Sequence, residues 1–233
     1  MSDLLEIDDL HAFYGDFQAL HGVSLRLRQG EVLALIGANG AGKSTLLKSI
    51  CGLVTARKGS IRWRGADLLG LAPNRIVAQG VALVPEGRRL FPSLSVEENL
   101  LLGGQVRRPG PWSLRAVYDL FPILQDKRNA PATSLSGGQQ QMVSIGRALM
   151  SNPDLILLDE LSLGLAPIVI KDIYAQLPRI TGQGMSAILV EQDVTRALGA
   201  CASFSCLVEG RVALAGAPGD HHRDAISAAY FGM

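Results

Sequence analysis

The sequence predicts an α/β protein, and three observations support this class. Short apolar runs of the kind that form buried strands alternate with helical patterns over much of the 233 residues. The strand runs are continuously apolar, which is typical of parallel strands buried on both faces of a sheet. A glycine-rich stretch directly follows one of these runs and leads into a helical pattern. We therefore expect a parallel sheet covered by helices on both faces.

The predicted elements divide the chain into a strand-rich start, a helical middle and an α/β end. Strands are predicted at residues 4–10, 23–27, 32–36, 61–63 and 81–84, and a helix follows the glycine-rich stretch from residue 46. Helices are predicted at residues 96–102, 115–121 and 139–150, with a Pro/Gly loop at residues 107–111. Strands at residues 155–158 and 187–190 flank a helix whose apolar residues recur at helical spacing: Ile170, Ile173, Leu177 and Ile180.

We interpret this order as one domain of residues 1–233. Residues 1–86 and 152–233 are predicted to form its core, and residues 87–151 a helical insertion. The chain end, from Asp220 onward, is predicted to form a solvated turn and a short terminal helix, with His221 and His222 at the surface.

The composition of the chain bears on which partners it binds and on its location in the cell. The formal net charge of +1 leaves no broad basic field to neutralise many phosphates, so nucleic acid is not expected as a partner. No uncharged apolar run approaches the roughly 20 residues that span a bilayer. Asp3 and Glu6 lie where a signal peptide carries basic residues. The three cysteines are an odd number without CxxC spacing and fit reduced thiols. These features favour the cytoplasm.

A phosphate-binding loop is predicted between the strand of residues 32–36 and the helix that follows. Residues 37–45 match the pattern G-x-x-x-x-G-K-[ST], in which backbone N–H groups wrap phosphates and the helix N-terminus adds attraction. Lys43 is expected to reach the β- and γ-phosphates, and the Ser44 hydroxyl to ligate Mg²⁺. The residues assigned to nucleotide binding in this loop are Gly37, Asn39, Gly40, Gly42, Lys43, Ser44 and Thr45.

Two adjacent carboxylates end the buried strand at residues 155–158. The carboxyl end of such a strand places Asp159 near the Mg²⁺ shell, where it is expected to hold the metal through water. Glu160, one residue further, is expected to act as the general base on the attacking water. A pair of surface acids at a strand end is the alternative, and the intact phosphate loop argues against it.

A third motif lies at residues 135–141, where Leu-Ser-Gly-Gly-Gln-Gln-Gln enters a helix. Ser136 and the exposed amides of Gly137 and Gly138 can form a second anion site at this helix N-terminus. Placed in this order between the phosphate loop and residues 155–160, the LSGGQ motif resembles the signature of the nucleotide-binding subunits of ATP-binding cassette (ABC) transporters. The resemblance runs over essentially the whole chain.

This resemblance implies a RecA-like P-loop ATPase core with an N-terminal antiparallel β-subdomain and an inserted helical subdomain that carries the signature. It also implies that Ser136, Gly137, Gly138 and Gln139 of one subunit complete the ATP site formed by the phosphate loop of another. Dimerisation would then be part of the mechanism. Tyr14 is similar to the aromatic that stacks on adenine in this family, although an aromatic beside a strand is often only part of the core.

Two substitutions narrow the resemblance. Glu86 stands where most ABC ATPases have the Q-loop glutamine, and Gln192 where most have the switch histidine. Together with residues 162–167 and 229–232, they resemble the LivF type of ATPase from branched-chain amino acid importers. If Glu86 lies close to Mg²⁺, it is expected to accept a hydrogen bond from metal-bound water; a solvated loop carboxylate is the alternative. Gln192 is expected to donate to the γ-phosphate without titrating near neutral pH.

Three positions depart from the family pattern. Ala166 replaces the usual aspartate of the D-loop, the segment expected to cross the dimer interface. Leu161 replaces the proline that usually follows the catalytic glutamate, but it removes no reacting group. Pro178 lies inside a predicted helix and is expected to kink or shorten it.

The resemblance implies an ATP-hydrolysing importer subunit at the cytoplasmic face of the inner membrane, bound peripherally to two transmembrane permease subunits. A second ABC ATPase, related or identical, would complete the dimer, and an extracytoplasmic solute-binding protein would deliver the solute. Branched-chain amino acids are the expected solute, with urea, short amides or other amino acids as alternatives.

Two other functions remain open. Soluble ABC proteins of translation or DNA repair usually carry two cassettes or long coiled-coil insertions, and this sequence shows neither. A nucleotide-dependent regulator would bind ATP and hydrolyse it poorly, and the presence of Glu160 argues against that function.

Overall fold

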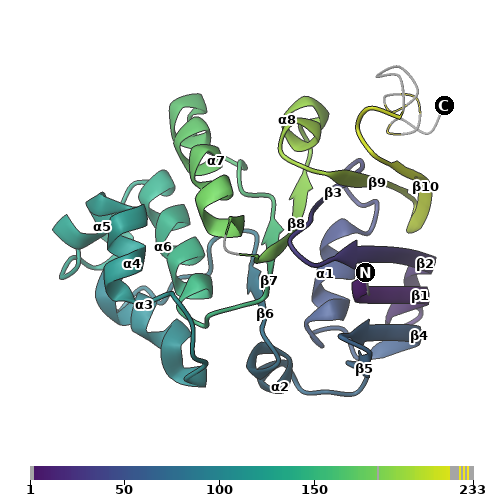
Figure 1. Ribbon diagram of the computed structural model, residues 1–233, viewed down its shortest axis with the longest axis horizontal. Coiled ribbons are helices and arrows are strands. Elements are labelled where there is room, and N and C mark those ends of the chain that lie inside the picture. The colour runs from purple at the N-terminus through teal and green to yellow at the C-terminus, as the bar shows by residue number, and fades with distance from the viewer. Residues whose placement is uncertain (1–2, 183, 221–225, 227, 229, 231–233) are drawn as a thin grey trace.

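The computed structural model describes residues 3–182, 184–220, 226, 228 and 230 of the chain. An antiparallel sheet is formed by β1 (Asp3–Tyr14), β2 (Phe17–Arg28), β4 (Ala56–Trp63) and β5 (Ala66–Asp67), in the order β2-β1-β4-β5. It lies at the right of Figure 1, and the helices of the chain's middle lie at the left. The antiparallel N-terminal sheet implied by the family resemblance is therefore confirmed.

The strand β1 is longer than the alternation of its residues predicts. Its buried side chains include Leu5 and Ile7 and then Leu10 and Ala12, so the buried face changes phase between residues 7 and 10. Asp9 adopts a φ of 48° there, and the pairing with β2 shifts register. A β-bulge adds one residue and so interrupts the alternation of buried and exposed side chains. The predicted strand therefore ended at residue 10, whereas β1 continues to Tyr14.

The second sheet has the order β10-β9-β3-β8-β7-β6. Its strands are β3 (Val32–Ile36), β6 (Val81–Val84), β7 (Leu155–Asp159), β8 (Ser186–Glu191), β9 (Ser203–Val208) and β10 (Arg211–Gly216). Every pairing from β9 to β6 is parallel, and β10 pairs antiparallel to β9 at the edge. The predicted parallel sheet is confirmed.

Side chains from successive residues of β7 enter two different cores. Leu155 and Leu157 pack in the cluster that contains helix α1 (Lys43–Ile50) and the antiparallel sheet. Ile156 and Leu158 pack in the cluster that contains helices α6 (Gly137–Leu149) and α7 (Pro167–Thr181). The parallel sheet is thus covered on both faces, which explains why its strands are continuously apolar.

The strand β9 escapes prediction because serines interrupt its apolar run. Ser205 is nevertheless buried, and the Ser203 hydroxyl donates to the Glu31 carboxylate. The edge strand β10 and the short helices α2 (Pro73–Ala78) and α8 (Val194–Gly199) were also not expected from the sequence. Short or edge elements carry few apolar residues and so give a weak periodic signal.

Helices occupy the middle of the chain, as predicted. They are α3 (Val96–Gly103), α4 (Leu114–Leu120), α5 (Pro122–Asp126) and α6, with 3₁₀ turns η1 (Gly104–Val106) and η2 (Ala132–Ser134). Ser95 caps α3 by accepting from the Glu98 amide, and the Glu98 carboxylate accepts from the Ser95 amide. This reciprocal capping box explains why α3 begins at Val96.

The last third of the chain contains a proline inside a helix and a terminal segment that is described only in part. Pro178 was expected to kink or shorten its helix; α7 continues through Pro178 to Thr181, so this residue does not end the helix. The predicted turn and terminal helix lie largely outside the described residues, as do His221 and His222. Asp220 lies in a turn, and Ile226, Ala228 and Tyr230 are helical.

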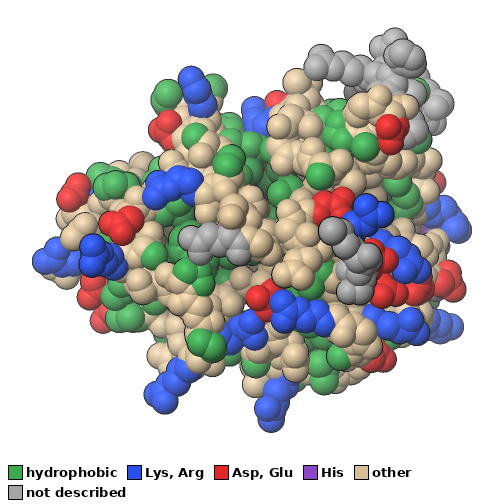
Figure 2. Space-filling model, in the orientation of Figure 1, with side chains coloured by type: hydrophobic (Ala, Val, Ile, Leu, Met, Phe, Trp, Pro, Cys, Tyr) green, Lys and Arg blue, Asp and Glu red, His purple; other side chains and the backbone are tan. Residues whose placement is uncertain are grey.

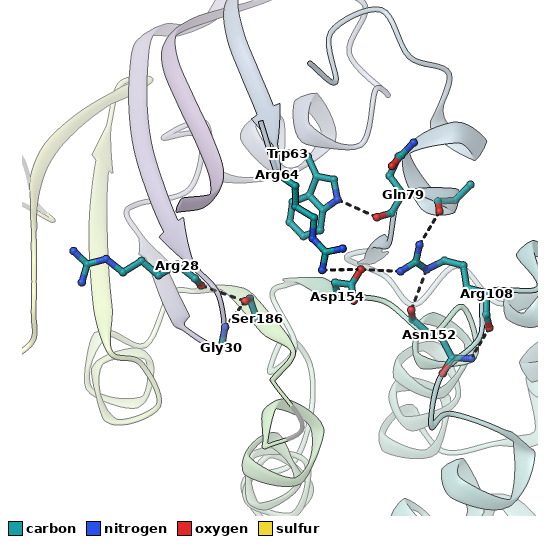
Figure 3. Close-up of polar contacts among 10 residues, drawn as sticks. Arg28, Gly30, Trp63, Arg64, Gln79, Arg108, Asn152, Asp154 and Ser186 are labelled. Atoms are coloured by element: carbon teal, nitrogen blue, oxygen red, sulfur yellow. Dashed lines mark hydrogen bonds and ion pairs between the residues drawn. The ribbon is translucent and has the colours of Figure 1, made fainter. Parts of the chain in front are cut away.

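Asp154 joins three parts of the chain, as Figure 3 shows. Arg108, from the loop after η1, and Arg64, at the end of β4, reach Asp154 from opposite sides. Their Nη2 atoms lie 2.7 and 3.3 Å from Asp154 Oδ2. Arg108 also donates to the carbonyl oxygens of Ala78 and Asn152. One carboxylate just before β7 therefore ties the helical middle of the chain to the antiparallel sheet.

Strand register brings residues distant in the sequence to one edge of the parallel sheet. Ile36 of β3 pairs with Glu191 of β8, and Asp159 of β7 pairs with Val190 of β8. The phosphate loop, the carboxylates of Asp159 and Glu160 at the end of β7, and the segment after β8 therefore lie side by side. A ligand site at this edge is typical of open parallel sheets.

The surface seen in Figure 2 carries both signs of charge. Basic and acidic side chains are interspersed over the antiparallel sheet at the right of that view. Arg26 on β2, for example, lies within 3.4 Å of carboxylate oxygens of Asp3, Glu6 and Asp8. In the described residues, no helix combines the length and apolar character that crossing a membrane requires.

Candidate nucleotide-binding site

The loop between β3 and α1 has a conformation that requires glycine. Gly37 and Gly42 adopt φ values of 149° and 101°. A Cβ atom on Gly37 would lie 2.3 Å from the carbonyl oxygen of Leu207, and one on Gly42 would lie 2.7 Å from Leu20 Cδ2. A side chain fits neither position, so the loop presents its backbone rather than side chains, as phosphate binding requires.

Lys43, the first residue of α1, has a buried ammonium group. Its Nζ donates to the carbonyl oxygens of Gly37 and Ala38, at 2.7 and 2.9 Å, and lies 4.0 Å from Glu160 Oε1. Burial lowers the pKa of the Lys43 ammonium, and the negative charges of Glu160 and Asp159 oppose this shift. The cation thus lies under the phosphate loop, in reach of phosphate oxygens held by the loop amides.

Ser44 and Asp159 meet directly across the sheet edge. The Ser44 hydroxyl donates to Asp159 Oδ1 at 2.9 Å, and the Asp159 residue is only 2% exposed. Burial raises the pKa of the Asp159 carboxyl; the Ser44 hydrogen bond opposes the rise, and the charges of Glu160 and Glu86 add to it. Hydroxyl and carboxylate oxygens are hard donors that fit Mg²⁺.

The predicted Mg²⁺ ligands do not make a complete cage. In the described part of the chain, no group of three His, Cys, Asp or Glu side chains is placed to hold a metal ion. Glu86 is exposed and lines the same pocket as Ser44. Few protein ligands are what Mg²⁺ requires in phosphate sites, because water and substrate phosphates complete its octahedron.

Glu160 and Gln192 line the same pocket as the phosphate loop. Gln192 Nε2 donates to Glu160 Oε2 at 2.8 Å. Glu160 adopts a φ of 50°, a left-handed conformation that is uncommon for residues other than glycine. Leu161 is buried in the core beside α6 and α7, which anchors the turn at this point. Leucine after the glutamate therefore contributes packing and leaves the Glu160 carboxylate in the pocket.

One pocket of about 480 Å³ gathers most of the predicted residues. Its lining includes Tyr14, Asn39, Gly40, Gly42, Lys43, Ser44, Thr45, Glu86, Glu160 and Gln192. Gly37 and Asp159 adjoin the pocket through their hydrogen bonds to Lys43 and Ser44. The structure thus brings together residues from both ends of the sequence in a volume typical of small-molecule sites.

Three residues that sequence reasoning missed also line this pocket: Phe17, Ala19 and Leu163. Phe17 pairs with Tyr14 across the end of the hairpin between β1 and β2, and the two side chains are 69% and 47% exposed. Both exposed aromatics therefore lie at one end of this hairpin and line the pocket. The signal in the sequence was the short Gly15-Asp16 turn between two aromatics, which places them opposite each other.

The signature residues lie outside this pocket. None of Ser136, Gly137, Gly138 and Gln139 is among its lining residues. Ser136 caps α6 by accepting from the Gln139 amide, and the Gln139 side chain accepts from the Ser136 amide. A Cβ on Gly138 would lie 2.3 Å from Val169 Cγ1 of α7. Within one chain these residues therefore shape the start of α6 and its packing.

Comparison with known proteins agrees with this geometry. The ABC transporter family model matches residues 20–162. The chain is 46% identical, over 91% of each chain, to the high-affinity branched-chain amino acid transport ATP-binding protein BraG of Pseudomonas aeruginosa. It is 33% identical to the probable branched-chain amino acid transport ATP-binding protein LivF of Archaeoglobus fulgidus, over 91% of this chain and 92% of LivF.

Among solved structures, an ATP-binding subunit of an ABC transporter superposes with a TM-score of 0.83 at 30% identity, over 98% of both chains. The family match covers the phosphate loop, the signature and the two carboxylates at the end of β7. The chain therefore belongs to the ABC transporter family, as an ATP-binding subunit with ATPase activity.

Proposed function

We propose that this chain hydrolyses ATP to energise the uptake of branched-chain amino acids by a membrane importer. The observation that carries the proposal is the near full-length similarity to BraG, which is named as a branched-chain amino acid transport protein. Glu86 and Gln192, the two substitutions by which the sequence resembles this subfamily, both line the ATP pocket. The transported solute has no site in this proposal, because the chain's contribution is the energy of ATP binding and hydrolysis.

ATP would bind with its phosphates on the loop amides of residues 37–45. Gly37, Asn39, Gly40, Gly42 and Thr45 belong to this loop or to the first turn of α1, where free N–H groups and the helix dipole attract anions. Lys43 supplies the positive charge under the loop. Tyr14, with Phe17 beside it, offers a face on which adenine can stack.

Mg²⁺, when bound with ATP, neutralises charge on the β- and γ-phosphates. Ser44 would ligate it through the hydroxyl that now donates to Asp159. Asp159 would accept from metal-bound water, and Glu86 lies at the same pocket to accept from another. The Asp159 carboxylate orients the Ser44 hydroxyl, so both side chains are already directed at one point.

Hydrolysis needs a base for the attacking water, and Glu160 would serve as that base. Its carboxylate faces the pocket between Lys43 and Gln192. Gln192 holds one carboxylate oxygen through its amide and would turn to donate to the γ-phosphate in the loaded site. An amide does not titrate near neutral pH, so its role is positional.

The signature residues complete the proposal at the level of the dimer. Because Ser136, Gly137, Gly138 and Gln139 lie outside their own chain's pocket, we infer that they serve the pocket of a second ABC ATPase subunit. Residues 1–86 and 152–233 would then form the ATP-binding core, and residues 87–151 the subdomain that presents the signature. Closure on ATP and reopening after hydrolysis would drive two permease subunits at the cytoplasmic face of the inner membrane, which an extracytoplasmic binding protein supplies with solute.

Affinity purification of the tagged chain from gently solubilised native membranes tests this function. Two multispanning permeases and a second ABC ATPase are expected to co-purify, and the reconstituted assembly should take up leucine, isoleucine or valine with ATP. Uptake of urea, short amides or other amino acids instead would show that branched-chain amino acids are not the transported solute. Recovery of ribosomal or DNA-repair proteins without permeases would reject transport, and ATP binding without turnover by the assembly would indicate a regulator.

A further inference from the structure

Glu191 is a buried carboxylate beside the ATP pocket that has no role in the chemistry above. It is the last residue of β8, directly before Gln192, and only 1% of its surface is exposed. It does not line the pocket, which its neighbour Gln192 does. Burying a carboxylate is costly unless its oxygens are hydrogen-bonded, so its partners show what it holds in place.

Two hydroxyl groups donate to Glu191, one to each oxygen. Ser162 Oγ lies 2.7 Å from Oε2, and Tyr174 Oη lies 2.6 Å from Oε1. Both distances are in the range of hydroxyls that donate to a carboxylate, which are stronger than neutral hydrogen bonds. Burial, the charge of Glu191 and the hydrogen bond to it raise the pKa of the Tyr174 hydroxyl, which keeps it a donor.

One of these partners lies on the turn that carries Glu160, and the other lies on the helix that follows this turn. Ser162 follows Glu160 by two residues, and Leu163 in the same turn lines the pocket. Tyr174 lies on α7, the helix that follows this turn. Glu191 therefore connects the strand end that carries Gln192 to the turn that carries Glu160.

The turn needs such a connection because its first residue is strained. Glu160 has a φ of 50°, and a non-glycine residue persists there only when its surroundings hold it. Its amide donates to the Val190 carbonyl at 3.1 Å, and the buried Leu161 side chain anchors the backbone behind it. The hydrogen bond from Ser162 to Glu191 adds a side-chain tie just beyond these contacts.

We propose that Glu191 is a positioning residue for ATP hydrolysis, whose two hydrogen bonds fix the Glu160 turn relative to Gln192. The proposal rests on the proposed roles of Glu160 and Gln192 in the pocket. Reaction rates are sensitive to such placement, since a displacement of about 1 Å can cost on the order of 100-fold. Glu191 would thus act on the rate of the chemical step without contacting ATP.

The test is removal of one donor at a time from this chain in the reconstituted importer assembly, because a second ABC ATPase subunit is inferred to complete its ATP site. Tyr174→Phe removes one hydroxyl with little change of volume, and Ser162→Ala removes the other. Tyr118→Phe is the matched control, because Tyr118 Oη donates to Glu97 Oε2 at 2.8 Å in the helical part of the chain. Steady-state ATP hydrolysis and amide hydrogen exchange of peptides covering residues 160–166 and 191–194 are measured for each variant.

We expect kcat to fall about tenfold in Tyr174→Phe and in Ser162→Ala, while KM for ATP stays within about twofold. Exchange in residues 160–166 should become faster in both variants and remain unchanged in Tyr118→Phe. A hydrogen bond that merely supports the fold would lower the unfolding temperature without this split between kcat and KM. Values of kcat, or of exchange in residues 160–166, that match those of Tyr118→Phe would overturn the proposal.

The variant Glu160→Gln separates this proposal from the proposed mechanism. If Glu160→Gln hydrolyses ATP at the wild-type rate, Glu160 is not the base and the proposed mechanism fails. Exchange in Tyr174→Phe still decides in that case whether Glu191 holds the turn. If Glu160→Gln is inactive while Tyr174→Phe keeps wild-type turnover and exchange, the mechanism stands and the role of Glu191 is rejected.

Discussion

Gln192 Nε2 donates to Glu160 Oε2 at 2.8 Å, while the other oxygen of the same carboxylate lies 4.0 Å from Lys43 Nζ. Each oxygen of Glu160 therefore faces a different neighbour, one a neutral amide and one a cation. This arrangement holds the carboxylate between the phosphate loop and the end of β8. The Glu160 carboxylate, the proposed base, therefore lines the same pocket as Lys43 and Gln192.

Glu160→Gln should retain ATP binding and lose hydrolysis. The amide cannot take the proton of the attacking water, and loss of a general base typically lowers the rate by about 100-fold or more. Steady-state hydrolysis and the Kd for ATP are the measurements. Glu6→Gln, on the antiparallel sheet, is the control and should keep both values. A Glu160→Gln chain with more than about a tenth of the wild-type kcat would contradict the assignment.

The pH dependence of kcat should differ between Gln192 and a histidine at this position. An amide does not titrate, whereas an unperturbed imidazole does so near pH 6.5. We expect Gln192→His to add an inflection between about pH 5.5 and 7.5 to the wild-type profile. Comparison of the two profiles cancels the titration of ATP itself. If the wild type already shows an inflection that Gln192→Ala removes, the positional role is wrong.

Asp159→Asn should stabilise the nucleotide-free chain at neutral pH and abolish Mg²⁺-dependent hydrolysis. Burial raises the pKa of the folded-state Asp159 carboxyl above its unfolded value of about 3.8. Between these two pKa values the folded state binds more protons, so stability falls as pH rises, and the loss is complete above the folded pKa. Asparagine avoids this loss and can still accept from Ser44.

Thermal unfolding of Asp159→Asn and wild type at a series of pH values measures this effect. The melting temperature of the variant should exceed that of the wild type at pH 7, and the difference should vanish below the unfolded pKa. A variant that is less stable than the wild type at pH 7 would show that the Asp159 carboxylate stabilises the fold.

Tyr14→Ala and Phe17→Ala should each weaken ATP binding. Loss of an aromatic that stacks on a base costs about 1–3 kcal/mol, or roughly 5- to 150-fold in Kd. Phe91→Ala is the control, because Phe91 is 51% exposed and does not line the pocket. Fluorescence titration with ATP and with inorganic triphosphate separates the base from the phosphates. If the substitutions weaken the binding of ATP and of inorganic triphosphate equally, the two aromatics do not contact adenine.

Arg108→Ala should destabilise the chain much more than Arg64→Ala, although both arginines contact Asp154. Arg108 lies 2.7 Å from the carboxylate and holds two carbonyl oxygens, and its side chain is 23% exposed. We expect a loss of about 2 kcal/mol in the free energy of unfolding. Arg64 lies at 3.3 Å and is half exposed, so its loss should be under about 1 kcal/mol. Denaturant unfolding measures both, and equal losses would contradict the ranking.

Much of the fold was predictable because its signals are local. The continuous apolar runs at residues 32–36, 81–84 and 155–158 predicted buried parallel strands, and the structure confirms each of them. Where the signal was interrupted, prediction failed. Serines interrupt the apolar run of β9, so this strand was not predicted. A bulge at Asp9 interrupts the alternation in β1, so its length was underestimated. Pro178 was expected to kink or shorten α7, and the helix is not shortened there because it continues to Thr181.

Three motifs of this protein could be found from residue spacing: a phosphate loop, a pair of carboxylates at the end of a buried strand, and an LSGGQ segment at a helix start. Each depends on residues a few positions apart in the chain. Which of these residues contact one another depends instead on the folded chain. Ser44 reaches Asp159 across 115 positions, and Glu191 finds Ser162 and Tyr174, because parallel strand order brings the ends of β3, β7 and β8 together. That order depends on packing between distant segments, which local periodicity does not encode.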